Sequence, residues 1–132
     1  MTFDPQAIFA NLTEKERVHG HHSAEGRAIR ILSRSLQGWW SGNLAGLDVI
    51  AMCDQAIEDW LKARLKVSAW SATGLSQLLA VAVATELITP VQLMRLQTVH
   101  DLRSHSTADP IAVGDVEAAL EWAIEIVERH WS

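Results

Sequence analysis

Hydrophobic residues recur every three or four positions along most of the chain, which is the pattern of amphipathic helices. No segment alternates apolar and polar residues as a half-buried strand would. Caps and breaks divide the pattern into six predicted helices, at 6–18, 24–37, 47–66, 74–87, 90–103 and 115–131. We therefore expect an all-α fold, a helical bundle of five or six helices.

The sharpest helix start in the chain is the sequence Thr89-Pro90-Val91-Gln92. It combines a threonine suited to the N-cap, a proline at the first helical position and a glutamine three residues after the cap. This combination is typical of a capping box. A helix is therefore predicted to begin at residue 90.

Three of the predicted helices have distinctive faces. On the helix at 24–37, Arg27, Arg30 and Arg34 share the face opposite to the apolar one. The helix at 74–87 contains the run Leu78–Ala84, which is apolar on every side and therefore predicts a central helix, covered by its neighbours or by a second subunit. The helix at 47–66 has a polar face that we expect to be solvated, formed by Gln55, Glu58, Asp59, Lys62 and Lys66.

Length and composition indicate one domain of 132 residues, with N-terminal helices and a connector at 1–43 and the main helical core at 44–132. Hydrophobic residues make up 48% of the chain, which disfavours disorder. No apolar run approaches the roughly 20 residues that a membrane-spanning helix needs. No secretory signal is recognised at the start, and the single cysteine, Cys53, cannot form an internal disulfide. We expect a cytoplasmic protein with no membrane segment.

The net charge of −5 comes from the segment after Arg103, and the preceding chain is neutral on balance. A strongly basic nucleic-acid-binding protein is therefore not indicated. Two roles remain open for Arg27, Arg30 and Arg34. They could contact a nucleic-acid backbone, or they could pair with the acidic face of the last helix, within one chain or between two. We favour the ion-pairing role. That acidic face consists of Glu117, Glu121 and Glu125.

Candidate chemistry concentrates where the helix at 90–103 ends. His100 and Arg103 share one stripe of this helix, and His105 follows in a polar loop. An imidazole can move protons near neutral pH, and a guanidinium can hold a phosphate, so together they could cleave RNA without a metal. The alternative, which spacing alone favours, is that His100 and Arg103 stabilise the helix C-terminus and that His105 is solvated.

Two further groups of residues have less specific patterns. His19, His21 and His22 could bind zinc or nickel, but no distant ligand pair completes a site, so we expect a solvated connector, no bound metal and no cofactor. Among the six tryptophans, Trp60 and Trp122 are predicted to lie in the core. The best interface candidate is the pair Trp39 and Trp40, which we place in a turn.

The run from Leu93 to His105, followed by a polar loop and a closing amphipathic helix, resembles HEPN-type domains. In that family a helix ends in Leu-Arg-Asn, and a last helix packs back against it. The helix at 47–66 is similar to the family's early helix, in particular the stretch Ala56-Ile57-Glu58-Asp59-Trp60-Leu61-Lys62-Ala63-Arg64-Leu65. The resemblance covers about residues 44–131, and it implies a HEPN-like bundle that forms a homodimer.

HEPN ribonucleases carry an arginine followed, after four to six residues, by a histidine. Arg103 matches the arginine, but Ala108, Asp109 and Pro110 occupy the positions expected for the histidine. Arg95 and His100 have the four-residue gap, about two turns earlier in the helix than the family places it.

HEPN-family members without this pair are thought to act in binding or assembly. The resemblance implies a binding or assembly role here too, with RNA or a protein as the partner. It also implies a defence or mobile-element setting. The first alternative is a metal-independent endoribonuclease using Arg103 with His105 or His100. A small-ligand or metal-binding helical bundle is the second alternative.

Overall fold

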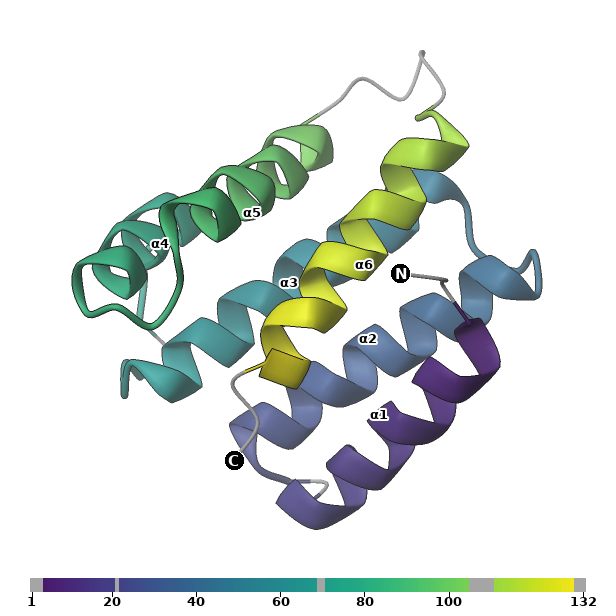
Figure 1. Cartoon of the computed structure of the whole chain (residues 1–132), viewed down its shortest axis with the longest axis horizontal. Coiled ribbons are helices and arrows are strands. Elements are labelled where there is room, and N and C mark those ends of the chain that lie inside the picture. Colours follow the sequence, from purple (N-terminus) through teal and green to yellow (C-terminus); the bar gives the residue numbers. More distant parts are fainter. Residues whose placement is uncertain (1–3, 21, 69–70, 105–110, 130–132) are drawn as a thin grey trace.

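The computed structural model describes residues 4–20, 22–68, 71–104 and 111–129 (Figure 1). Within these ranges all the regular secondary structure is α-helix and no strand is present, which confirms the predicted all-α fold class. No described helix is both long enough and apolar enough to cross a membrane. The six helices are α1 (Pro5–His19), α2 (Ala24–Trp40), α3 (Gly46–Arg64), α4 (Leu75–Ala84), α5 (Pro90–Arg103) and α6 (Val113–Arg129).

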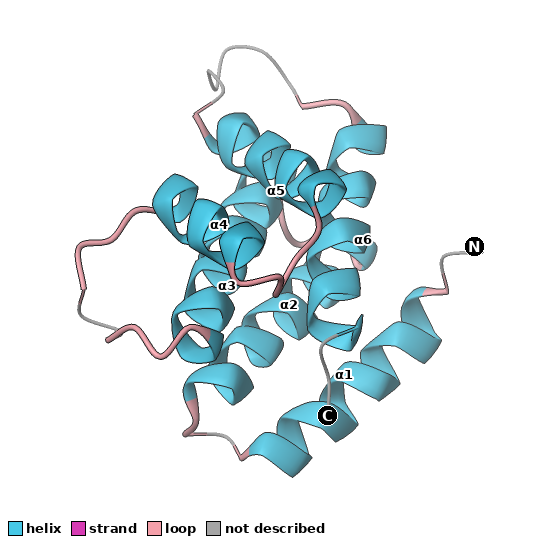
Figure 2. Ribbon diagram, turned by 60° about the vertical axis from the view of Figure 1, so that its left-hand side comes forward, coloured by secondary structure: helices cyan, strands magenta, loops and turns pink. Residues whose placement is uncertain are grey.

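Helix α3 is the centre of the bundle, because it packs against α2, α4, α5 and α6. Helix α1 lies along the other side of α2, while α4 and α5 form a pair at the opposite end of the molecule (Figures 1 and 2). The central position of α3 explains its burial on several faces. The apolar residues Val49, Ile50, Cys53, Ile57, Trp60 and Leu61 are all buried.

Helix α5 begins as its sequence predicts. The Thr89 hydroxyl accepts a hydrogen bond from the Gln92 backbone amide, and the Gln92 side chain accepts one from the Thr89 amide. This reciprocal pair is a complete capping box, with Pro90 at the first helical position. It fixes the residue at which α5 starts.

The predicted turn at Trp39 and Trp40 is wrong, because α2 continues through both residues and the chain turns at Gly42, whose φ is +78°. Trp39 packs partly against the core, whereas the Trp40 side chain is 56% exposed. Gly38 allows this continuation because Leu44 packs directly against it and leaves no room for a Cβ atom.

The predicted exposure of Lys62 is wrong, and neighbours within the chain do not cover α4, so that cover by a second subunit stays a prediction. Lys62 is buried, because the connector after α3 folds back and the Ser71 carbonyl accepts a hydrogen bond from Lys62 Nζ at 3.1 Å. Helix α4 is not central: Leu78 and Leu79 face inward, but Val81 is exposed and α4 lies at the edge of the bundle (Figure 1). Its short apolar run therefore leaves one hydrophobic face in solvent.

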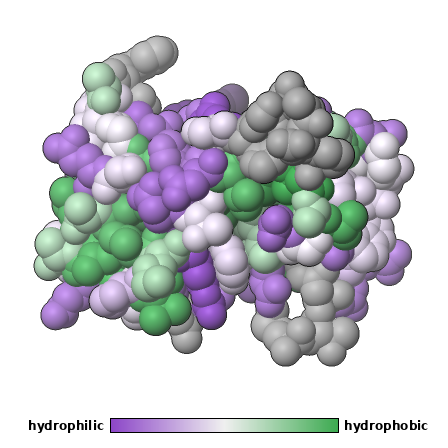
Figure 3. All heavy atoms as spheres, turned by 90° about the horizontal axis from the view of Figure 1, so that it is seen from above, coloured by the Kyte–Doolittle hydropathy of each residue, from purple (hydrophilic) through white to green (hydrophobic). Residues whose placement is uncertain are grey.

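Hydrophobic side chains also reach the surface on the end of the molecule formed by α4 and α5, where Figure 3 shows a green area. The large exposed hydrophobic residues of these two helices are Val81, Val91 and Met94. A second apolar area at the other end includes Trp40, which lines a hollow of about 260 Å³ together with Phe9 and Leu36. Apolar surface is thus present at both ends of the bundle.

Candidate functional site

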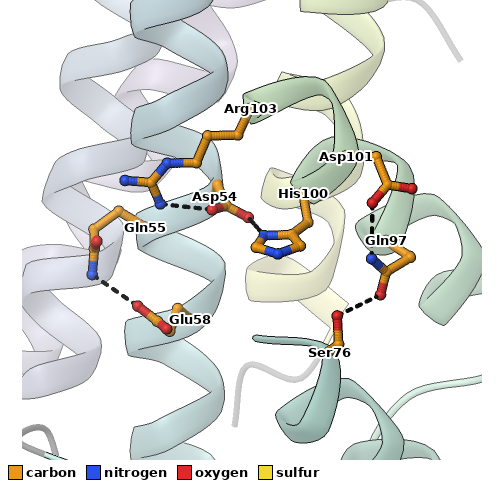
Figure 4. Close-up of polar contacts among 8 residues, drawn as sticks. All are labelled: Asp54, Gln55, Glu58, Ser76, Gln97, His100, Asp101 and Arg103. Carbon is orange, nitrogen blue, oxygen red and sulfur yellow. Dashed lines mark hydrogen bonds and ion pairs between the residues drawn. The ribbon is translucent and has the colours of Figure 1, made fainter. Parts of the chain in front are cut away.

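A buried carboxylate on α3 holds two side chains of α5. Asp54 accepts a hydrogen bond from His100 Nδ1 at 3.0 Å through one oxygen and from Arg103 Nη1 at 2.7 Å through the other (Figure 4). The Asp54 side chain is only 3% exposed, whereas those of His100 and Arg103 are 36% and 44% exposed. The carboxylate thus lies beneath the surface, and its two partners reach solvent.

The geometry follows from helix periodicity. His100 and Arg103 are three residues apart, so they project from the same side of α5 toward α3. Leu96 and Val99 are fully buried and fix that side of α5 against the core. Because apolar packing sets the rotation of the helix, both polar side chains are brought to the same point on α3.

The contact with the Asp54 carboxylate indicates which nitrogen of His100 carries a proton. An ionised carboxylate can only accept hydrogen bonds, so His100 Nδ1 carries a proton. In a neutral imidazole the lone pair then lies on Nε2, the atom turned away from Asp54. Arg103 has five N–H donors, of which Asp54 takes one at Nη1. Burial of Asp54 is tolerated because both of its oxygens have charged or polarised partners.

The arrangement can perform two tasks. It joins α5 to α3, and it presents an oriented imidazole beside a guanidinium at the surface. An imidazole held by a carboxylate can act as a general base or acid, and a guanidinium binds phosphate or carboxylate groups. The first task is structural, and the second is the chemistry of an anion-binding site.

Further polar residues of α3 lie next to this cluster. The Gln55 amide donates to Glu58 at 3.3 Å and to Asp59 at 2.9 Å. Glu58 is one helical turn after Asp54, so it lies on the same side of α3, as Figure 4 shows. The candidate site therefore has an imidazole and a guanidinium on α5, from His100 and Arg103, and an acceptor-rich part on α3.

Two further candidate residues come from this part of the chain, His105 and Arg95. His105 lies outside the described residues. Arg95 faces α6 instead of α3, with Nη1 at 3.5 Å from a Glu125 oxygen and its guanidinium 5.8 Å from the centre of the Trp122 ring. Arg95 and His100 have the four-residue gap of HEPN ribonucleases. The Arg95 side chain nevertheless contacts α6, whereas the His100 side chain contacts α3.

The three arginines of α2 have different surroundings. Arg27 is exposed and donates to the His22 carbonyl at 2.8 Å. Arg30 is half-buried and pairs with Glu16 of α1 at 3.8 Å. Arg34 is exposed. The predicted uniform basic stripe is therefore interrupted in the middle by an ion pair with α1.

One histidine of the cluster between α1 and α2, His19, joins the two helices. His19 Nδ1 lies 3.3 Å from a Glu25 oxygen, and His22 is exposed. His21 is outside the described residues. In the part of the chain that the structure describes, no three histidine, cysteine or carboxylate side chains are grouped as metal ligands would be.

Asp54 is the member of the site that sequence analysis missed. The signal was present, because Asp54 lies four residues after Ile50 and three before Ile57, within the apolar stripe of α3. An acid at such a position is rarely buried without a cationic partner. Searching for that partner on another helix would have led to Arg103.

Comparison with known proteins finds no matching family model, no matching curated protein and no matching solved structure. The cluster of Asp54, His100 and Arg103 is therefore the feature that bears on function.

Proposed function

We propose that this chain is a HEPN-like RNA-binding module, non-catalytic or degenerate as a nuclease, that contacts a backbone phosphate through Arg103 and His100. The observation that carries the proposal is the buried Asp54 carboxylate, which holds both side chains at the surface. Binding sites need contacting groups whose geometry is fixed by supporting residues, and Asp54 supplies that support.

The charge distribution limits the size of the binding site. The chain carries a net charge of −5, and two further acids, Glu58 and Asp59, follow Asp54 on α3. A long stretch of RNA backbone would be repelled by this surface. One or two phosphates at Arg103 and His100, with the rest of the nucleotide directed elsewhere, fit these charges.

The proposal is tested by fluorescence anisotropy with a labelled single-stranded RNA dodecamer in EDTA. Arg103→Ala should weaken binding about tenfold, because a charge-assisted hydrogen bond contributes about 1.5–3 kcal/mol. Arg17→Ala is the matched control, since Arg17 is exposed on α1 and its removal changes the net charge equally. We expect that control to stay within about twofold of the wild type.

Two outcomes would contradict the proposal. One is the absence of RNA binding at micromolar protein, and the other is equal loss of affinity in the Arg103 and Arg17 variants. Arg27→Ala combined with Arg34→Ala tests the alternative that α2 contacts the RNA backbone. A larger loss in that double variant than in Arg103→Ala would move the binding site to α2.

The second candidate function is metal-independent RNA cleavage, which the orientation of His100 favours. With Nδ1 bonded to Asp54, Nε2 can take the proton of a ribose 2′-hydroxyl. The 2′-oxygen then attacks phosphorus and the bond to the 5′-oxygen breaks, giving a 2′,3′-cyclic phosphate and a 5′-hydroxyl. The 5′-oxygen takes its proton from water or from His105, and Arg103 would offset the charge that develops on the phosphate.

Cleavage is tested by incubating RNA with the protein in EDTA and identifying the cyclic phosphate. His100→Ala should abolish the reaction, and a DNA strand of the same sequence should stay intact because it lacks the 2′-hydroxyl. A wild-type protein that binds RNA without cutting it supports the binding module. Cleavage that survives both His100→Ala and Arg103→Ala would place the chemistry outside this cluster.

We also propose that two copies associate through the apolar end formed by α4 and α5, in the cytoplasm. The exposed Val81, Val91 and Met94 support this part of the proposal. Light scattering should give a dimer for the wild type at micromolar concentration and a monomer for Met94→Glu. A wild-type monomer would exclude the homodimer, whereas Val18→Glu, on the exposed surface of α1, should leave the mass unchanged.

A further inference from the structure

The hollow between α1 and α2 is formed by other helices than the Asp54 cluster. It measures about 260 Å³ and lies where the start of α1 meets the end of α2, and its apolar lining comes from Pro5, Phe9, Leu36 and Trp40. Trp40 is 56% exposed. Small-molecule pockets are mostly apolar and measure about 300–1,000 Å³. A hollow just below that range fits one ring system of a ligand, with the rest of the ligand outside.

The polar groups that line this hollow are neutral. No charged side chain is among its described lining residues, and two side-chain amides, those of Gln6 and Gln37, are. Neither amide has a hydrogen-bond partner in the described part of the chain. Each amide offers both a donor and an acceptor. A nucleobase carries both kinds of group around a flat ring that stacks on tryptophan, whereas a hydrocarbon ring or an acyl chain would use neither amide.

A cation lies on the same side of α2, just outside the hollow. Arg30 pairs with Glu16 of α1, and Gln37 lines the hollow with α1 residues, so both positions face α1. Arg34 lies between them on the same stripe, about 4.5 Å along the helix axis from Gln37. It is exposed and has no ion pair or hydrogen bond with another described residue. Its guanidinium can therefore bind an anionic group of a ligand whose ring lies in the hollow.

The start of α1 offers no competing place for that anionic group. The backbone amides of Gln6 and Ala7 already donate to the Asp4 carboxylate, at 3.1 and 3.3 Å. A phosphate there would meet this negative charge instead of unpaired amides. The charges around the hollow thus orient a ligand with its anionic end toward Arg34.

From these contacts we infer that the hollow binds a free nucleoside monophosphate, with its base beside Trp40 and its phosphate on Arg34. The ribose of such a molecule separates base from phosphate, as about one turn of α2 separates the hollow from the arginine. Because Arg34 is a single cation on a chain with a net charge of −5, it matches one phosphate better than a strand of them. The inference does not depend on the proposed function, which concerns α3 and α5.

The experiment titrates AMP into the full chain labelled with ¹⁵N and follows the indole N–H signals by NMR. The Trp40 signal is the one that is missing from the spectrum of Trp40→Phe. We expect AMP to shift this signal with a Kd of about 0.1–1 mM, as one stacked ring and one ion contact would give. The signal of the buried Trp60 should stay in place. Adenosine should bind about tenfold more weakly, because it lacks the phosphate.

Two arginine variants test the phosphate contact. Arg34→Gln should weaken AMP binding about tenfold and leave adenosine binding unchanged. Arg27→Gln is the matched control, because it removes the same charge from an exposed position of α2 about two turns earlier. It should stay within about twofold of the wild type.

Four outcomes would overturn the inference. The first is a Trp40 signal that does not move at millimolar AMP, and the second is equal binding of AMP and adenosine. The third is equal weakening of AMP binding in the two arginine variants. The fourth is an RNA hexamer without terminal phosphates that shifts the Trp40 signal at lower concentrations than AMP does. That result would assign the hollow to an RNA strand instead of a free nucleotide.

Discussion

Asp54 and Arg103 are 49 positions apart in the chain, yet Asp54 Oδ2 and Arg103 Nη1 are 2.7 Å apart across the contact between α3 and α5. The same carboxylate bonds His100 through its other oxygen. One buried side chain thus determines both how α5 rests on α3 and where two potential ligand-binding groups lie.

Asp54→Asn should destabilise the protein by about 2 kcal/mol. The amide keeps the size of the side chain but loses the charge and one acceptor, so one of its two charge-assisted hydrogen bonds is lost or reversed. Urea unfolding followed by circular dichroism measures the change. Asp48→Asn, on the exposed surface at the start of α3, should cost less than about 1 kcal/mol. Equal stability of the Asp54 variant and the wild type would mean that the cluster does not join the helices.

RNA binding should depend only weakly on salt. If one or two phosphates are contacted, the slope of log K against log salt concentration is about −0.7 to −1.4 for a single strand. This slope is measured by anisotropy titrations at potassium chloride concentrations from about 50 to about 300 mM. Arg103→Ala should bring it close to zero. A slope several times steeper would indicate an extended basic track.

Trp60 and Trp40 are a matched pair for testing where the core lies. Trp60 is 2% exposed and Trp40 is 56% exposed. Trp60→Ala should cost about 3–5 kcal/mol because it leaves a large cavity in the core. Trp40→Ala should cost less than about 1 kcal/mol. Similar losses of stability in the two variants, measured by thermal or urea unfolding, would contradict the packing.

The capping box of α5 should be worth about 1 kcal/mol. Thr89→Ala removes the hydroxyl that accepts the Gln92 amide, so the first turn loses one of its hydrogen bonds. Thr98→Ala is the control, because Thr98 is exposed in the middle of the same helix and alanine has the higher helix propensity. The control should be neutral or slightly stabilising in urea unfolding. The cap has no role if both variants behave alike.

The buried cysteine predicts a pH effect at high pH. Burial raises the pKa of the Cys53 thiol from 9.0 to about 12, an effect that a hydrogen bond with Ser35 partly offsets. Below pH 9 the thiol is protonated in both states and contributes no pH dependence. Above pH 9 the unfolded chain releases the proton and the folded chain keeps it, so stability falls by about 1.4 kcal/mol per pH unit until about pH 12.

This effect is measured as the difference in unfolding free energy between the wild type and Cys53→Ala across that range. The difference should grow steadily with pH, because lysines and other groups titrate alike in both proteins. Native Cys53 should also resist thiol reagents at pH 8 and react once urea unfolds the chain. Rapid labelling of the native protein would show that the thiol is accessible.

Much of the fold could be predicted from the sequence alone. Helix periodicity, the capping box at Thr89 and the absence of strand alternation fixed the class and most of the helix boundaries, because these signals are local. The turn predicted at Trp39 was wrong, because α2 continues through Gly38, where Leu44 packs too closely for any side chain, and ends at Trp40. The prediction that Lys62 is solvated failed because it depended on how a connector folds back.

The candidate site, like the fold, could be predicted from the sequence only in part. His100 and Arg103 could be placed on one side of a helix from their spacing, which depends only on the helix period. What they face was decided by tertiary structure, because Asp54 comes from another helix and no local pattern links the two segments. Spacing also paired Arg95 with His100, and the packing of α6 separated them. Local periodicity determines which side chains share a face, and only helix packing determines which of those faces meet.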